Sequence, residues 1–163
     1  MPIELYRVDD RLIHGQVVVG WGRPLDLAFL VVVDDDVASS EWEQELYRMG
    51  VPPEMDVHFH TVADAARLHG TYQHDPRPGL LLTGDVGTMR RLVDASGDVR
   101  TVNIGGIHHR AGRVQRLRYV FLTPVEEVEL RALAARGVTV TAQDVPSARE
   151  VPLDDILSAD GDA

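Results

Sequence analysis

Apolar residues gather in short runs that alternate with polar or amphipathic segments along the chain. An apolar run at 3–8 predicts a strand, the continuous apolar run at 27–33 is typical of a strand buried on both faces of a sheet, and the segment 80–83 predicts a short buried strand. Further strands are predicted at 55–60, 99–104, 119–122 and 138–141. In the last of these, apolar and polar residues alternate, which indicates a half-exposed strand at an edge.

Capping and stop signals place helices between these strands. Ser40 and Glu43 predict a capping box for a helix that ends near Met49, before Gly50. Further helices are predicted at 61–69, 86–94 and 124–136. The last has the strongest start, because Thr123-Pro124 supplies a cap and a proline at the first helical position. The segment 71–79, with two prolines, is predicted to be a loop.

Alternating strands and helices predict an α/β fold with a single open, mostly parallel β-sheet, helices on both faces and an antiparallel edge strand. We expect one domain over 1–163, with a tail from about 147 that is partly irregular around an apolar anchor at Ile156-Leu157. In such a fold the carboxyl ends of the strands gather loops on one rim. These are the segments 9–16, 34–38, 83–85 and 105–112.

Composition narrows the classes of function. The formal net charge is −10, which argues against binding to nucleic acid or to anionic membranes. All 16 basic residues are arginine, so a Walker A loop and a Schiff-base lysine are excluded. The absence of cysteine excludes disulfides and thiolate metal sites. We find no run near the roughly 20 apolar residues of a membrane span and no signal peptide, so we expect a cytoplasmic protein.

The segment 9–16 concentrates polar residues at a predicted strand-to-helix turn. The start of a helix favours an anion there, and Arg11 adds a planar positive group suited to phosphate. His14 adds a nitrogen that can act as nucleophile or base near neutral pH. The alternative is structural: a lone histidine beside apolar residues, with Asp9 and Asp10 capping the turn or pairing with Arg11.

The run Asp-Asp-Arg-Leu-Ile-His-Gly-Gln-Val at 9–17, followed by Trp21, resembles the phosphorylation-site signature of a known family. That family is the enzyme IIB components of the mannose/fructose/sorbose group of the bacterial sugar phosphotransferase system. Shorter similarities follow in order along most of the chain. They are Asp35-Asp36-Val37-Ala38, Pro52-Pro53, Asn103-Ile104-Gly105-Gly106 and Arg136-Gly137-Val138.

The resemblance implies a fold of the same class and a defined activity. His14 would accept a phosphoryl group at Nδ1 from the phosphohistidine of a IIA partner and pass it to a sugar during uptake through membrane IIC and IID partners. The chain would then be cytoplasmic, peripherally associated with the permease, without a cofactor, and inactive toward free sugars until its membrane partners are present. The alternative is a regulatory phosphocarrier that never meets a permease. A homo-oligomer is compatible with either.

Within this reading Arg11 would stabilise the transferring phosphoryl group. A carboxylate about 5 Å from a phosphate charge opposes binding by roughly 3 kcal/mol at an effective dielectric near 20. Asp9 and Asp10 therefore cannot both point at the phosphate, and we expect one to brace Arg11 or the loop and the other to orient the imidazole. Gly15 and Gln16 would complete the phosphate loop.

Four residues from neighbouring loops are further candidates for the site: Asp35, Thr83, His108 and His109. Thr83 fits a hydroxyl on the phosphate and a cap of the next helix equally well. His108-His109 fits a supplement to the site or a solvated loop, and it departs from the apolar or aromatic residues of the family at this position. Gly84-Asp85 departs as well. The resemblance therefore says less about the sugar than about the chemistry.

A metal site is not expected. His58 and His60 would share one face of a strand, but the sequence identifies no further ligands for them. Asp34-Asp35-Asp36 is interpreted as a solvated acidic turn, because phosphohistidine exchange needs no metal to make its nucleophile.

Overall fold

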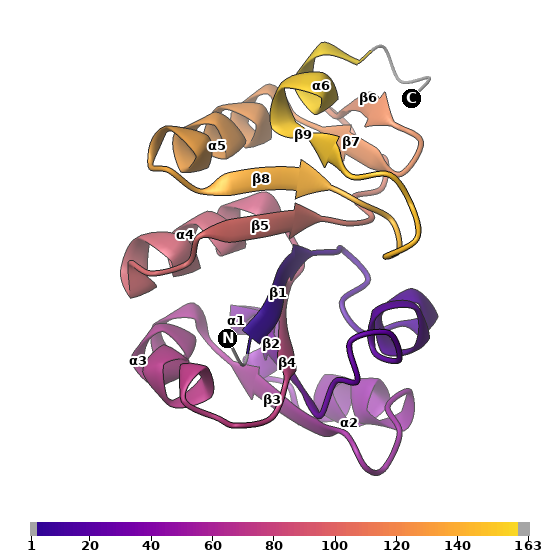
Figure 1. The fold of residues 1–163 in the computed structure, drawn as a ribbon, viewed down its shortest axis with the longest axis vertical. Helices are drawn as coiled ribbons and strands as arrows, with labels where there is room; N and C mark the ends of the chain where they lie inside the picture. Colours follow the sequence, from indigo (N-terminus) through magenta and orange to yellow (C-terminus); the bar gives the residue numbers. More distant parts are fainter. Residues whose placement is uncertain (1–2, 160–163) are drawn as a thin grey trace.

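The computed structural model describes residues 3–159, in which a seven-stranded sheet organises the chain (Figure 1). The strand order is β3-β2-β4-β1-β5-β8-β9, and every pairing is parallel except that of β8 with β9. The strands are β1 (Ile3–Val8), β2 (Phe29–Val33), β3 (Asp56–His60), β4 (Gly79–Thr83), β5 (Thr101–Ile104), β8 (Thr139–Ala142) and β9 (Val151–Pro152). The predicted fold class is confirmed.

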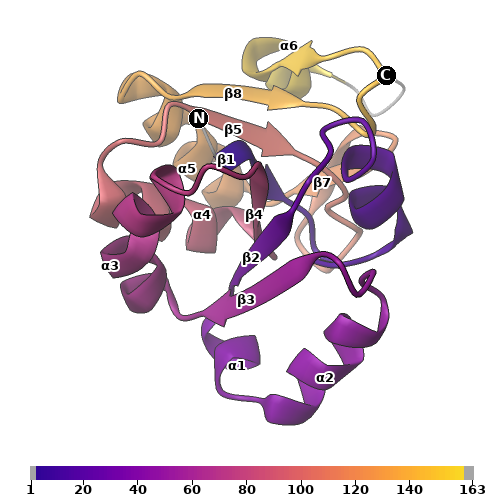
Figure 2. The same cartoon turned by 60° about the horizontal axis from the view of Figure 1, so that its bottom comes forward.

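Helices cover both faces of the sheet, as the two views in Figures 1 and 2 show. One face carries α3 (Val62–Gln73), α4 (Val86–Ser96) and α5 (Pro124–Ala135). The other carries η1 (Gln16–Trp21), a single π-helical turn, and α2 (Glu41–Met49), which follows the short α1 (Asp35–Ala38). The last helix of the described residues is α6 (Leu153–Ser158). Among the helices of residues 3–159, none has the length and apolar character that crossing a bilayer requires.

Successive side chains of the central strands point alternately into two hydrophobic cores, one on each face of the sheet, which explains the continuous apolar runs in the sequence. In β2, Phe29, Val31 and Val33 pack with the helices α3, α4 and α5, whereas Leu30 and Val32 pack with η1. All five side chains are fully buried. The sheet is therefore a rigid layer between two cores, and its carboxyl rim is a well-supported place for a site.

Most predicted helices are present, with corrections at their ends. Thr61 caps α3 through the backbone N–H of Asp64, but α3 continues to Gln73, so residues 71–73 are helical and not loop. The Thr123 capping box of α5 forms as predicted. The capping box predicted for α2 does not, because the Ser40 side chain makes no capping hydrogen bond.

The edge of the sheet is the main topological correction. The strand predicted at 138–141 is not an edge strand, because β9 from the tail pairs antiparallel with it as β8. The predicted apolar anchor lies in α6, where Ile156 and Leu157 are buried. The strand predicted at 119–122 does not join the main sheet but forms a hairpin of β6 (Val114–Leu117) with β7 (Val120–Leu122).

The loops predicted to share one rim do meet there. The backbone N–H of Asp9 donates to the carbonyl of Thr83 at 2.9 Å, and that of Asp10 donates to the carbonyl of Gly106 at 2.9 Å. A side chain at Gly84 would contact Asp34 and Leu12. Three segments that are distant in sequence are thus packed around the turn that follows β1.

Candidate functional site

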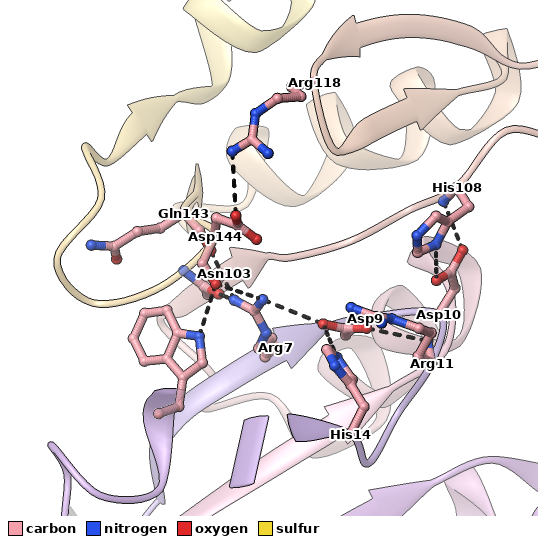
Figure 3. A network of polar contacts seen from close by, with 11 residues as sticks. Arg7, Asp9, Asp10, Arg11, His14, Asn103, His108, Arg118, Gln143 and Asp144 are labelled. Atoms are coloured by element: carbon pink, nitrogen blue, oxygen red, sulfur yellow. Dashed lines mark hydrogen bonds and ion pairs between the residues drawn. The ribbon is translucent and has the colours of Figure 1, made fainter. Parts of the chain in front are cut away.

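His14 lies in the turn between β1 and η1 and is held by a carboxylate. Its Nε2 lies 2.9 Å from Oδ2 of Asp9, which is fully buried, and the His14 side chain is 12% exposed (Figure 3). Because the carboxylate only accepts, this contact assigns the ring proton to Nε2. Within residues 3–159, Nδ1 has no hydrogen-bond partner and keeps its lone pair.

Arg7 lies beneath this pair as a wholly buried cation. Its guanidinium donates to Oδ2 of Asp9 at 3.3 Å, to Oδ1 of Asn103 at 2.5 Å and to the backbone carbonyls of Gln143 and Asp144 at 2.9 and 3.1 Å. It also stacks over Trp21, 5.1 Å from the ring centre. Trp21 in turn donates to the Asp144 carbonyl, so η1 is tied to the same network.

Sequence reasoning missed Arg7, although a signal was present. An arginine inside a strand that is otherwise apolar must find partners when it is buried, because an unpaired buried charge is very costly. Gly105 belongs to the same arrangement. A Cβ at that position would collide with the Arg7 guanidinium, so a residue with a side chain would displace the cation from Asp9.

The network keeps Asp9 ionised. Burial raises the pKa of the Asp9 carboxyl, but the hydrogen bond and charge of His14 and the charge of Arg7 outweigh it and hold the pKa below its ordinary value. Burial lowers the pKa of Arg7, while Asp9 opposes that change. The Arg7 guanidinium therefore stabilises the negative charge of Asp9, and the Asp9 carboxylate in turn accepts a hydrogen bond from the His14 ring.

The turn itself directs Arg11 outward. Leu12 has a φ of 57° and is buried in the core beside η1, so the chain reverses at this point. Arg11 is exposed, and its backbone N–H donates to Oδ1 of Asp9 at 3.2 Å. In the described part of the chain, its guanidinium makes no hydrogen bond. The predicted helix-start site is weaker than expected, because the backbone N–H groups of Val17 and Val18 both donate to the His14 carbonyl.

The contacts of Asp9 and Asp10 differ from the prediction that one would brace Arg11 or the loop and the other would orient the imidazole. Asp9 orients the imidazole and also braces the Arg11 backbone. Asp10 contacts neither Arg11 nor His14 but holds His108, whose Nδ1 lies 2.6 Å from Oδ1 and whose backbone N–H donates to Oδ2 at 2.7 Å. Both carboxylates are therefore engaged within the protein.

A hollow of about 230 Å³ opens beside the turn. It is lined by residues from the His14 turn, from the loop after β5, from the β6–β7 hairpin and from the segment after β8. They are Arg11, Gln16, Gly106, His108, Arg118, Tyr119, Phe121 and Asp144. Arg118 pairs with the Asp144 carboxylate at 3.4 Å, so the lining carries one free and one paired arginine.

The remaining candidates fall in different places. The Thr83 hydroxyl is fully buried and donates to the Asp85 carbonyl, while Asp85 caps α4, so Thr83 neither caps that helix nor reaches the hollow. Asp35 accepts from the Val62 N–H and pairs with Arg91 at 2.9 Å, which ties α1 to α3 and α4 instead of to His14. His109 packs edge-to-face on Phe121, a lining residue of the hollow.

Side chains that could hold a metal do not cluster in the part of the chain that the structure describes. Across residues 3–159, no three His, Asp or Glu side chains come together as potential ligands. His58 and His60 share one face of β3, as predicted, with their rings stacked 6.3 Å apart. His60 is engaged with the Tyr72 hydroxyl at 2.6 Å.

Comparisons with known proteins identify the family of the chain. Residues 3–162 match the family model of the PTS system sorbose subfamily IIB component, where PTS denotes the sugar phosphotransferase system. The N-acetylgalactosamine-specific phosphotransferase enzyme IIB component 1 of Escherichia coli K12 is 33% identical, over 94% of this chain and 97% of the relative. The mannose-specific EIIAB component of the same organism is 29% identical, and the chain spans 49% of its length.

A solved structure extends the agreement to the fold. The IIBSor domain of the sorbose permease from Klebsiella pneumoniae superposes with a TM-score of 0.87 at 31% identity, covering 96% of this chain and 97% of that domain. The fold and these similarities define a phosphotransferase subunit of a sugar transport system. The chain belongs to the sorbose subfamily of PTS IIB components, within the mannose/fructose/sorbose family.

Proposed function

We propose that His14 is the residue that carries the phosphoryl group, accepting it at Nδ1 from the phosphohistidine of a IIA protein. It then passes the group to a sugar that enters through IIC and IID membrane partners. The observation that carries this proposal is the 2.9 Å contact between Asp9 and Nε2 of His14. That contact leaves Nδ1 with the lone pair that a nucleophile needs.

The transfer to His14 is an exchange of one nitrogen–phosphorus bond for another. The Nδ1 lone pair attacks phosphorus in line with the departing donor nitrogen, whose bond electrons return to the donor ring. The His14 ring keeps its proton on Nε2 and gains positive charge. The buried Asp9 carboxylate lies against that proton, and Arg7 keeps the carboxylate ionised, so the charged ring is stabilised where it forms.

Arg11 and the glycine beside His14 serve the approach of the phosphoryl group. The Arg11 guanidinium is exposed and uncommitted within residues 3–159, so it is available to bind phosphate oxygens, with a hydrogen bond to a charged group contributing about 1.5–3 kcal/mol. Gly15 is exposed, and a Cβ there would meet nothing within the chain. Its lack of a side chain therefore leaves room for the donor protein, and the fold does not require it.

In sugar transport, the role of this subunit is to deliver the phosphoryl group. Without a membrane-spanning helix among residues 3–159, sugar translocation falls to the IIC and IID partners, and this subunit delivers phosphate at the permease. Similarity to relatives named for N-acetylgalactosamine, mannose and sorbose leaves the sugar of this chain open among hexoses and hexosamines.

The test is a two-stage transfer assay with purified proteins. A IIA protein carrying labelled phosphohistidine is mixed with the native chain and with His14→Ala. The native chain should take up acid-labile label and His14→Ala should take up none while unfolding at the same temperature. Labelled native chain should then form sugar phosphate only when membranes bearing IIC and IID are added. Equal labelling of His14→Ala, or rapid transfer to free sugars, would overturn the proposal.

A further inference from the structure

The pair formed by Asp10 and His108 is the feature that the transfer to His14 does not use. Asp10 is 9% exposed on its side chain, and both of its oxygens bind His108, one at the ring Nδ1 and one at the backbone N–H. The ring contact assigns the proton of the neutral imidazole to Nδ1. Nε2 is then a basic nitrogen, and within residues 3–159 it makes no hydrogen bond.

Elimination singles out this nitrogen among the groups that line the hollow. Arg11 and Arg118 have no lone pair to accept a proton, and the Asp144 carboxylate is paired with Arg118. Burial above all, with the charge of Asp144, raises the pKa of Tyr119, so its phenol stays protonated. His108 remains as the lining residue with a free basic site.

The placement of His108 suits the incoming acceptor better than the phosphoryl group. In an in-line transfer, the attacking oxygen lies on the side of phosphorus opposite to Nδ1 of His14, about 3–3.5 Å from phosphorus before reaction. A base for that oxygen must therefore stand away from the His14 ring. In Figure 3 the rings of His14 and His108 lie apart, with Asp9 and Asp10 between them.

We propose that His108, oriented by Asp10, is the general base that takes the proton from the acceptor hydroxyl when the phosphoryl group leaves His14. The inference rests on the proposed function of His14. The hydroxyl oxygen forms a bond to phosphorus, and its proton passes to Nε2 of His108. The bond between phosphorus and Nδ1 breaks, and its electron pair returns to the His14 ring, which becomes neutral.

This role separates the two half-reactions. Transfer from a phosphohistidine to His14 moves no proton, so His108 is not needed for charging. Transfer to any O–H acceptor releases a proton, so His108 is needed there. Water serves as the probe acceptor, because its O–H loses the same kind of proton and no permease is required.

The charged surroundings of His108 come from four segments. Asp10 binds its ring, and Arg113, which is paired with Glu126 of α5, donates to its backbone carbonyl. Arg11 and Arg118 share the hollow with it, and a Cβ at Gly106 would contact both His108 and Asp9. The two arginines and Asp10 thus place charges of both signs around the His108 ring.

The experiment measures release of inorganic phosphate from purified, labelled protein at pH 8. His108→Asn keeps an N–H donor for Asp10 but removes Nε2, and His109→Asn is the matched control because His109 packs on Phe121 instead of on Asp10. Both variants should charge at the native rate and unfold at the native temperature.

At pH 8, release from the native chain and from His109→Asn should proceed at the same rate. Release from His108→Asn should be at least about a hundredfold slower, the low end of what a positioned base contributes. Native release from His108→Asn, or equal slowing in both variants, would overturn this inference while leaving the charging of His14 intact. Failure of the native chain to charge at all would overturn the proposed function and this inference with it.

Discussion

The buried Arg7 guanidinium lies 3.3 Å from the same Asp9 oxygen that contacts Nε2 of His14 at 2.9 Å. One carboxylate oxygen thus joins a fixed charge in the core to a reactive ring at the rim. The arrangement resembles the way other enzymes use a buried aspartate to set the tautomer of a catalytic histidine. It makes the stability of the fold and the chemistry of the site depend on the same contacts.

Removing Arg7 should therefore damage both properties. Arg7→Met fills most of the same space but leaves Asp9 without its buried cation, so the free energy of unfolding should fall by about 3–5 kcal/mol. Denaturation in urea measures this loss, and the surviving folded protein should charge slowly. Native stability in Arg7→Met would show that Asp9 does not need Arg7.

Neutralising Asp9 should impair charging. Asp9→Asn keeps the shape and a hydrogen bond to His14 but removes the negative charge that stabilises the charged ring. Replacing a hydrogen bond to a charged group by a neutral one costs about 1–1.5 kcal/mol, which corresponds to charging that is roughly 5 to 13 times slower. The rate of label uptake from a IIA phosphohistidine measures it, and an unchanged rate would remove Asp9 from the mechanism.

The same carboxylate should leave a signature in the pH dependence of stability. The pKa of Asp9 is lower in the folded chain than in the unfolded chain, where it is about 3.9. Its contribution to the free energy of unfolding is present above that value and is lost as pH falls through the lower folded-state pKa. Urea unfolding from pH 7 to pH 3 should show a steeper acid loss in the native chain than in Asp9→Asn. Parallel curves would contradict the shift.

Arg11 and Gly15 are predicted to matter for transfer and not for folding. Arg11→Lys keeps the charge but loses the planar donor fork, so charging should slow about tenfold or more while the unfolding temperature stays unchanged. Arg131→Lys, on the exposed side of α5, is the matched control and should behave as the native chain. A large loss of stability in Arg11→Lys would make Arg11 a structural residue.

Gly15→Ala tests whether the exposed glycine makes room for the donor protein. The position has a φ of −54° and open space around it, so alanine should not reduce stability. Charging by a IIA protein should nevertheless slow, because a methyl group then stands beside His14. Gly70→Ala in α3, where a Cβ also meets nothing, should leave charging unchanged. Equal charging of both variants would show that Gly15 is not part of the docking surface.

Local patterns predicted much of this fold because each strand and helix is specified by its own residues. The runs at β2 and β4 are apolar at every position since both faces are buried, and Thr123-Pro124 fixes the start of α5. Local patterns could not identify β9 as the strand at the edge of the sheet. β9 is two residues long, and its pairing with β8 depends on where the loop after β8 returns the tail.

The site likewise has one part that the sequence reveals and another part that only the folded structure brings together. The turn around His14 is contiguous in sequence, so its residue types revealed it. Its supports are not contiguous, because Arg7 meets Asn103, Gln143 and Asp144 only after the sheet has formed. The pairing of Asp10 with His108 likewise joins two rim loops that are 98 residues apart. Charge arguments showed that the two aspartates need different partners, but only tertiary packing identifies those partners.

The most direct test of the account is the identity of the nitrogen that bears phosphorus. Native chain charged by a IIA phosphohistidine can be examined by ³¹P and ¹⁵N NMR, which distinguish the two ring nitrogens. The contact between Asp9 and Nε2 predicts a single phosphohistidine at Nδ1 of His14, absent from His14→Ala. Phosphorus on Nε2 of His14, or on any other residue, would contradict the central claim that Asp9 selects the nucleophilic nitrogen.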